Sequence, residues 1–123
     1  MPTASPTEVE GNGSILTPGG HAAFDMDVSL QQNKKKTKAV GSFSYSDPAA
    51  NLSFSSNKIT SLTFIGNRAR FTGTAKVGKK SQLSFTVDAT DNGRPGTLDM
   101  FSIQVSTGYS ASGNLINGDI TIR

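Results

Sequence analysis

Apolar and polar residues alternate with a period of two over most of the chain, which is the pattern of half-buried β-strands. The clearest case is a pair of segments at residues 24–30 and 39–45. A hairpin folded at Lys34-Lys35 brings their apolar residues to one side and leaves aspartates and serines on the other. Its predicted cross-strand pairs are Leu30 with Ala39, Val28 with Gly41, Met26 with Phe43, and Phe24 with Tyr45.

Two further predicted turns set the strand pairing in the middle of the chain. A two-residue turn at Gly66-Asn67 and a three-residue loop at residues 78–80 each reverse the chain between alternating segments. The Phe85 ring is expected to lie over Gly73 and cover the backbone that a strand glycine leaves exposed. The predicted pairs are Leu62 with Phe71, Phe64 with Ala69, Ala69 with Ala89, Phe71 with Val87, Gly73 with Phe85, and Ala75 with Leu83.

The C-terminal part of the chain continues the pattern. Alternation over residues 101–105, followed by a turn around Thr107, predicts pairing with residues 109–113. Asn117-Gly118 is a strong signal for a two-residue hairpin. The pairs expected across that hairpin are Leu115 with Ile120 and Gly113 with Ile122. Shorter candidate strands are residues 14–16 and 51–55.

These hairpins predict an all-β fold without helices. The expected architecture is a single antiparallel flattened barrel or sandwich of roughly eight to nine strands, mostly connected by hairpins. Large inward residues alternate with alanine and glycine, which suits a narrow barrel with little room for a large ligand. Residues 1–10, dominated by Pro, Ser and Thr, are expected to be a flexible linker or an engineered boundary, and residues 11–123 one β-domain.

The composition excludes several kinds of active site. Zero cysteines remove disulfides, thiolate metal sites and cysteine nucleophiles, and the single histidine, His21, has no partner for an acid–base pair. The serines lack a Gly-x-Ser-x-Gly elbow. Asp25 and Asp27 share one strand face, but a solvated face is preferred over a glycosidase pair because no aromatic-lined cleft accompanies them. We therefore expect that the protein is not an enzyme and has no catalytic residue.

The formal charge of +3 has a local origin. Lys34, Lys35, Lys36 and Lys38 contribute four positive charges within five residues, and the rest of the chain is nearly balanced. A charged hairpin tip that keeps the sheet soluble is the preferred interpretation. Binding of an acidic glycan or surface at this tip is the alternative. Nucleic acid is not expected, because no aromatic residue is interleaved with the lysines, and no membrane span is expected.

The segment from Asp88 to Asp99 carries the densest set of oxygen-bearing side chains. Asp88, Asp91, Asn92 and Asp99 supply carboxylate and amide oxygens, which calcium prefers as ligands. A loop held by its own Asx turns and hydrogen bonds is the preferred interpretation. A calcium site is the alternative, weakened by the positive charge of Arg94 and by a spacing unlike known calcium loops. No other cofactor is expected.

Several of these segments resemble the small Gly/Ser/Thr-rich post-choice-of-anchor β-domain of bacterial secreted and surface-anchored proteins. The most specific are the loop Asp91-Asn92-Gly93-Arg94-Pro95-Gly96 and the hairpin Gly108-Tyr109-Ser110-Ala111-Ser112-Gly113. The resemblance runs from about Gly11 to Ile122.

The resemblance implies export and a non-enzymatic accessory role. The expected function is a non-catalytic extracellular module with a structural, spacer or adhesion role in a larger secreted or cell-surface protein. Its partners would be neighbouring domains, with self-association as a variant. The alternative is a module that binds glycans or calcium through the Asp91–Asp99 loop or the lysine-rich tip.

Overall fold

The structure, a computed structural model, describes residues 7–17, 20–33, 36–77, 81–91 and 99–122. The side chains of residues 32–37, 77 and 81 lie outside this description. The described residues form eight strands and one 3₁₀ turn, η1 (Pro48–Ala50). The strands are β1 (Glu8–Thr17), β2 (Gly20–Asn33), β3 (Lys36–Asp47), β4 (Leu52–Ile65), β5 (Arg68–Val77), β6 (Ser81–Thr90), β7 (Met100–Val105) and β8 (Ser110–Ile122).

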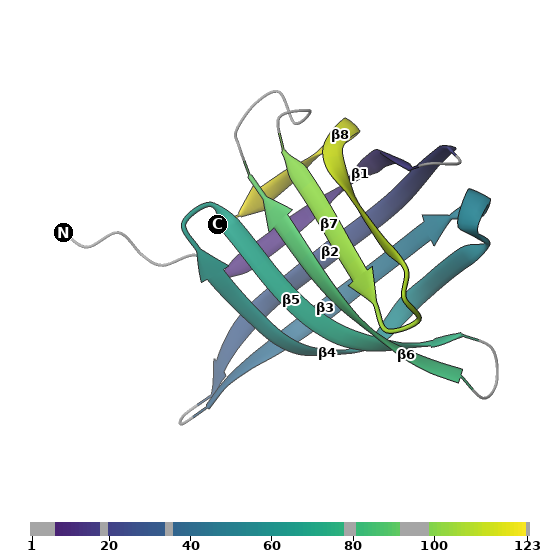
Figure 1. Cartoon of the computed structure of the whole chain (residues 1–123). Coiled ribbons are helices and arrows are strands. Elements are labelled where there is room, and N and C mark those ends of the chain that lie inside the picture. The colour runs from purple at the N-terminus through teal and green to yellow at the C-terminus, as the bar shows by residue number, and fades with distance from the viewer. Residues whose placement is uncertain (1–6, 18–19, 34–35, 78–80, 92–98, 123) are drawn as a thin grey trace.

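The strands close into one antiparallel barrel (Figure 1). Each strand pairs with its neighbour in the chain, and β8 returns to pair with β1. This confirms the expected all-β antiparallel barrel. The barrel is flattened into a β1–β3 sheet and a β5–β7 sheet, because β4 and β8 each pair first with one sheet and then with the other. Among the described residues, no helix is long and apolar enough to cross a membrane.

The predicted registers of the β2–β3, β4–β5 and β5–β6 hairpins are confirmed. The β2–β3 ladder pairs Met26 with Phe43, and the other three predicted pairs of that hairpin are present. The predicted pairs of β5 with β4 and β6 are also present. At Gly73, a Cβ atom would lie 2.7 Å from the Phe85 ring, so the aromatic does cover this glycine as expected. Turn length and the alternation of apolar and polar residues were therefore sufficient to predict the cross-strand pairs of these three hairpins.

The hairpin predicted at Asn117-Gly118 is wrong. β8 runs straight through these residues, and its C-terminal half pairs with β1 instead of folding back on itself. Gly118 has a positive φ of 88°, yet it pairs with Gly13 of β1 and does not form a turn; the register shift of this ladder lies nearby, between Leu115 and Asn117. Such a glycine suits both structures, which is why the local signal misled the prediction.

The first strand is longer than the short candidate at residues 14–16. β1 begins at Glu8, three residues before the expected start of the domain at Gly11, and Val9 is fully buried. Two of its inward positions are Gly11 and Gly13, so the hydrophobic signal of the strand is weak. Likewise, the candidate at residues 51–55 is the first part of one long strand, β4, and the total is eight strands.

Aromatic side chains fill the interior of the barrel. Phe24 of β2 stacks on Phe101 of β7, with 4.2 Å between ring centroids. Phe43 lies among five other rings at centroid distances of 5.1–6.3 Å, which joins the two sheets through the core. These rings are those of Tyr45, Phe54, Phe71, Phe85 and Phe101. These ring contacts pack the described part of the barrel interior with side chains.

A hydrogen-bond chain links two tyrosines to a buried carboxylate. The Tyr109 hydroxyl donates to Oδ2 of Asp47 at 2.6 Å, and the Tyr45 and Tyr109 hydroxyls lie 2.6 Å apart. Because the Tyr109 proton is already donated, Tyr45 must be the donor between the tyrosines. Burial, followed by the hydrogen bond to Asp47, raises the pKa of Tyr109, and burial raises the pKa of Tyr45. Both phenols therefore stay neutral and act as hydrogen-bond donors.

Candidate functional site

Acidic side chains gather on the outer face of three consecutive strands of the barrel. Val9 points into the core, so its neighbours Glu8 and Glu10 point outward, and the same alternation exposes Asp25 and Asp27 on β2. Asp119 of β8 lies opposite Asn12 of β1. We call these five residues the acidic face: Glu8, Glu10, Asp25, Asp27 and Asp119.

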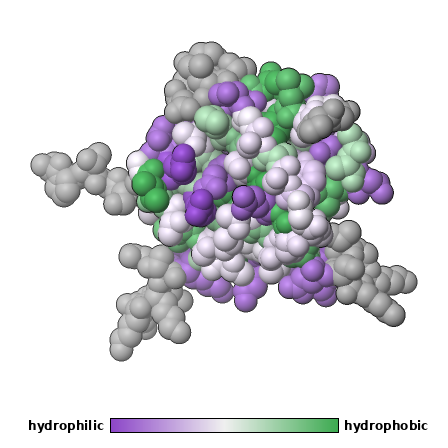
Figure 2. Space-filling view, in the orientation of Figure 1, coloured by the Kyte–Doolittle hydropathy of each residue, from purple (hydrophilic) through white to green (hydrophobic). Residues whose placement is uncertain are grey.

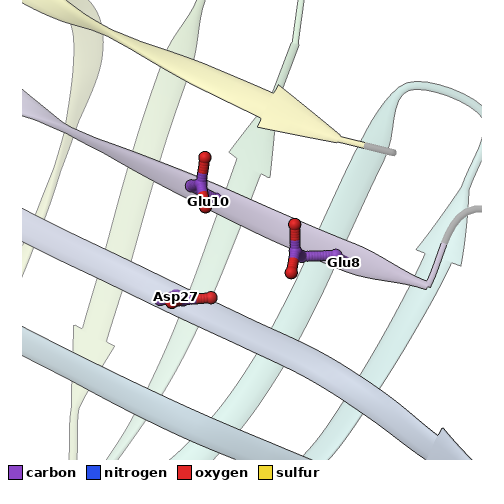
Figure 3. A group of neighbouring side chains, drawn as sticks. All are labelled: Glu8, Glu10 and Asp27. Carbon is purple, nitrogen blue, oxygen red and sulfur yellow. The ribbon is translucent and has the colours of Figure 1, made fainter.

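Three of these carboxylates are close neighbours. Glu10 pairs directly with Asp27 across the β1–β2 ladder, and one carboxylate oxygen from each of Glu8, Glu10 and Asp27 lies within 4.8 Å of the others. Figure 3 shows Glu8 and Glu10 on one strand with Asp27 beside them on the next. Like charges placed directly opposite each other on a sheet destabilise it. The three carboxylates therefore concentrate negative charge on this part of the barrel surface.

An open hollow lies over the same strands. Its lining includes Glu10, Asp25, Asp27 and Asp119, so four of the five acidic side chains border it. At Gly11, which also lines the hollow, a Cβ atom would collide with the carbonyl oxygen of Asp119. Glycine at this position lets β8 approach β1 and brings Asp119 up to the other acids.

A second hollow continues the same outer face towards β3 and β4. It shares Asp25 with the first and is otherwise bordered by small polar and core residues. Four serines on the two strands contribute hydroxyl groups to its lining: Ser44, Ser46, Ser53 and Ser55. The β1–β3 sheet thus presents carboxylates on one half of its surface and hydroxyls on the other.

Basic side chains gather on β4 and β5. Arg68, Arg70 and Lys76 occupy outward positions of β5, where they alternate with buried residues, and Lys58 is exposed on β4. We call these four residues the basic face. Arg70 makes an ion pair with Asp88 of β6 at 2.8 Å, and this hydrogen bond raises the Arg70 pKa. Figure 2 looks onto this side of the molecule, where strongly hydrophilic residues lie among pale, weakly polar ones.

The predicted calcium ligands have other contacts in the structure. Asp88 binds Arg70, as described above, whereas Asp91 and Asp99 both reach β8. Oδ2 of the buried Asp99 accepts a hydrogen bond from the Ile120 N–H at 2.8 Å, and Oδ2 of Asp91 accepts one from the Ile122 N–H at 3.2 Å. These carboxylates satisfy N–H groups of β8 beyond its ladder with β7.

The fourth ligand of the predicted calcium site, Asn92, lies outside the described residues. The calcium site therefore stays a prediction. From the sequence, the preferred interpretation is a loop held by its own hydrogen bonds; the hydrogen bonds of Asp91 and Asp99 are structural contacts, but their donors belong to β8 and not to the loop itself.

The lysine-rich tip is described only in part. Lys38 is exposed on β3, opposite Gln31 of β2. Lys36 is the first residue of β3, but its side chain lies outside the description, and so do Lys34 and Lys35 altogether. Binding of an acidic partner at this tip stays a prediction.

Sequence reasoning recognised Asp25 and Asp27 as a solvated pair but missed the larger acidic face. Glu8 and Glu10 were assigned to the linker, and Asp119 to a hairpin that does not exist. A signal was present, because residues 1–33 contain four acidic residues and no lysine or arginine. His21 is exposed, as expected for a surface residue.

Comparison with known proteins adds no assignment: no family model, curated protein or solved structure matches the chain.

Proposed function

We propose that this chain is a non-catalytic extracellular module with a structural, spacer or adhesion role in a larger secreted or surface-anchored bacterial protein. The observation that carries this proposal is the barrel interior, which is filled by the packed rings around Phe43. Because a packed barrel offers its outer surface to partners, the module would act through its faces. The resemblance to post-choice-of-anchor domains supports export and an accessory role.

The proposal is tested by looking for turnover that depends on the exposed carboxylates. Purified protein is incubated with panels of polysaccharide, ester and peptide substrates, and the double variant Asp25→Asn/Asp27→Asn is the matched control. We expect no turnover from either protein. Turnover by the natural sequence that the double variant lacks would overturn the proposal, because it would assign catalysis to this acid pair.

A ligand-binding role through calcium or a glycan is the alternative function. Thermal unfolding in excess calcium and after chelation tests the calcium version, because a ligand bound only by the folded state raises the melting temperature. For the accessory module proposed above, we expect the two melting temperatures to agree. A calcium-dependent rise that Asp88→Asn abolishes would favour the calcium site, and specific binding on a glycan array would favour the glycan version.

A further inference from the structure

The charges of this protein are segregated by strand. Within their bounds, β1, β2 and β8 contain five acidic residues and no lysine or arginine. Within theirs, β4 and β5 contain four lysines and arginines and no acidic residue. The acidic face and the basic face are therefore each of one sign in the strands that form them.

The closed topology places these two faces on opposite sides of the barrel. In a ring of eight strands, β1 and β5 are four positions apart in either direction, which is the greatest separation available. β1 is the middle strand of the acidic face, and β5 carries three of the four basic residues. In Figure 1, β5 lies on the near side of the barrel and β1 on the far side.

We propose that the module associates head to tail with further copies of itself, with the acidic face of one copy docked on the basic face of the next. The inference rests on the proposed accessory role and specifies it, because a module that stacks on its own kind is a spacer or adhesion unit. Complementary charge on opposite faces steers such an encounter and sets its orientation.

The signs of the two faces exclude a twofold dimer through either of them. A twofold interface brings the same patch of both copies together, so it would place Asp27 near Asp27 or Arg68 near Arg68. A head-to-tail contact instead brings basic side chains of the next copy to acidic side chains such as Asp25 and Asp27, which are both exposed. Such a contact leaves one acidic and one basic face free, so association continues beyond two copies.

Exposed apolar side chains on the same strands add contact area for such an interface. Of the four large hydrophobic side chains exposed in the described part of the chain, Leu16 lies on β1, Ile116 on β8 and Ile65 on β4. Ile65 is 77% exposed and pairs with Arg68, which places it within the basic face. Apolar residues inside a polar surround are the usual composition of a protein–protein interface.

Sedimentation velocity and light scattering of the purified chain at low and high salt are the first test. At about 20 mM NaCl we expect an average mass above one chain that rises with protein concentration, and an association constant roughly tenfold lower at about 300 mM NaCl. A mass of one chain at every concentration in low salt would overturn the inference. Association that salt does not weaken would do the same.

A charge swap tests which faces meet. Asp25→Lys/Asp27→Lys changes the formal charge of the acidic face from −5 to −1, and Lys58→Glu/Lys76→Glu changes that of the basic face from +4 to 0. All four side chains are exposed, and circular dichroism and thermal unfolding verify that both variants fold. Each variant alone should remain a single chain, because one of its two faces has lost most or all of its charge. An equimolar mixture should associate, because the intact basic face of the first variant meets the intact acidic face of the second.

Lys38→Glu is the control variant, since Lys38 is an exposed lysine on β3, outside both faces. It should associate like the natural sequence. Association that survives either swap, or that mixing fails to restore, would overturn the inference. Loss of association on chelation, reversed by calcium, would also overturn it, because a cation and not a second copy would then hold the acidic face. None of these outcomes depends on turnover, so failure here is distinct from failure of the proposed function.

Discussion

At the scale of single residues, the hydrogen-bond chain from Tyr45 through Tyr109 to Asp47 is the feature of the interior that depends most on a single side chain. Asp47 is 2% exposed, and its carboxylate also accepts a hydrogen bond from the Ala50 N–H at 3.4 Å, which begins η1. Tyr109 stands between the other two groups, donating one hydrogen bond and accepting another. A buried carboxylate is tolerated when hydrogen-bond donors such as these satisfy it. The Tyr109 hydroxyl therefore makes a large contribution to the stability of the fold.

Tyr109→Phe should therefore cost more than Tyr45→Phe. The first change removes both hydrogen bonds and takes a donor from the Asp47 carboxylate, at a cost of about 2–3 kcal/mol. The second removes one hydrogen bond between neutral groups, at about 1 kcal/mol. Urea unfolding of the two variants measures the difference. Equal losses, or a larger loss for Tyr45→Phe, would contradict the proposed direction of the hydrogen bonds.

The same two phenols predict a loss of stability at alkaline pH. Their pKa values are raised in the folded protein, mainly by burial, whereas in the unfolded chain tyrosine ionises near pH ~10. Above that pH the unfolded state releases protons that the folded state retains. The stability tied to these groups is thus complete below pH ~10 and falls as the pH rises further.

The free energy of unfolding, followed from about pH 8 to 11, measures this effect. We expect it to fall less steeply in Tyr109→Phe than in the natural sequence, because the variant lacks one of the two titrating groups. Parallel curves for the two proteins would show that Tyr109 does not contribute to the alkaline loss.

At the scale of elements, the contact between β1 and β8 closes the barrel and depends on glycine. Gly118 adopts a left-handed φ of 88°, and a Cβ atom there would collide with the carbonyl oxygen of Asn12. At Gly11 a Cβ atom would collide with Asp119. The two strands therefore lie closer together than side chains at these positions permit.

Gly118→Ala should destabilise the protein by about 2–4 kcal/mol, because backbone strain and a collision with β1 act together. Gly66→Ala is the matched control: its φ of 59° is also left-handed, but nothing lies within 4 Å of the added methyl group. The control should lose only about 1 kcal/mol. Chemical unfolding compares them, and similar losses would show that the close approach of β1 and β8 contributes little.

At the scale of the whole molecule, closure of the barrel assembles charges that are far apart in the chain. Asp119 joins Glu10 and Asp27 only because β1 lies between β8 and β2. The opposing basic side chains of β5 are held on the far side of the ring. The molecule is thus polarised across its two sheets even though its net charge is only +3.

Asp27→Asn should stabilise the single folded chain by up to about 0.5 kcal/mol in low salt, because it removes a like charge from opposite Glu10. The gain should shrink in high salt, which screens the repulsion. Thermal unfolding at low protein concentration measures it, with Asp88→Asn as the comparison. Asp88→Asn breaks the exposed ion pair with Arg70 and should leave stability unchanged or lower it slightly. A destabilised Asp27→Asn would contradict the repulsion.

Strand pairings could be predicted from the sequence when the two strands were close together in the chain. The register of the hairpin from β2 to β3 follows from the alternation around Lys34-Lys35, because a short turn leaves the two strands one pairing that buries both apolar faces. The same holds for the hairpins on both sides of β5. In the candidate site, the exposed position of Asp25 and Asp27 could be predicted for the same reason.

The sequence by itself therefore determined the all-β class, the local hairpins and the inward side of most strands, since each depends on neighbouring residues and turn geometry. The tertiary structure alone decided that β1 pairs with β8, more than a hundred residues away at Val9 and Ile122, through glycines that carry no hydrophobic signal. With that pairing it decided that Asp119 borders the same hollow as Glu10. The acidic face and the basic face depend on closure of the barrel, because only closure determines which strands are neighbours and which lie on opposite sides.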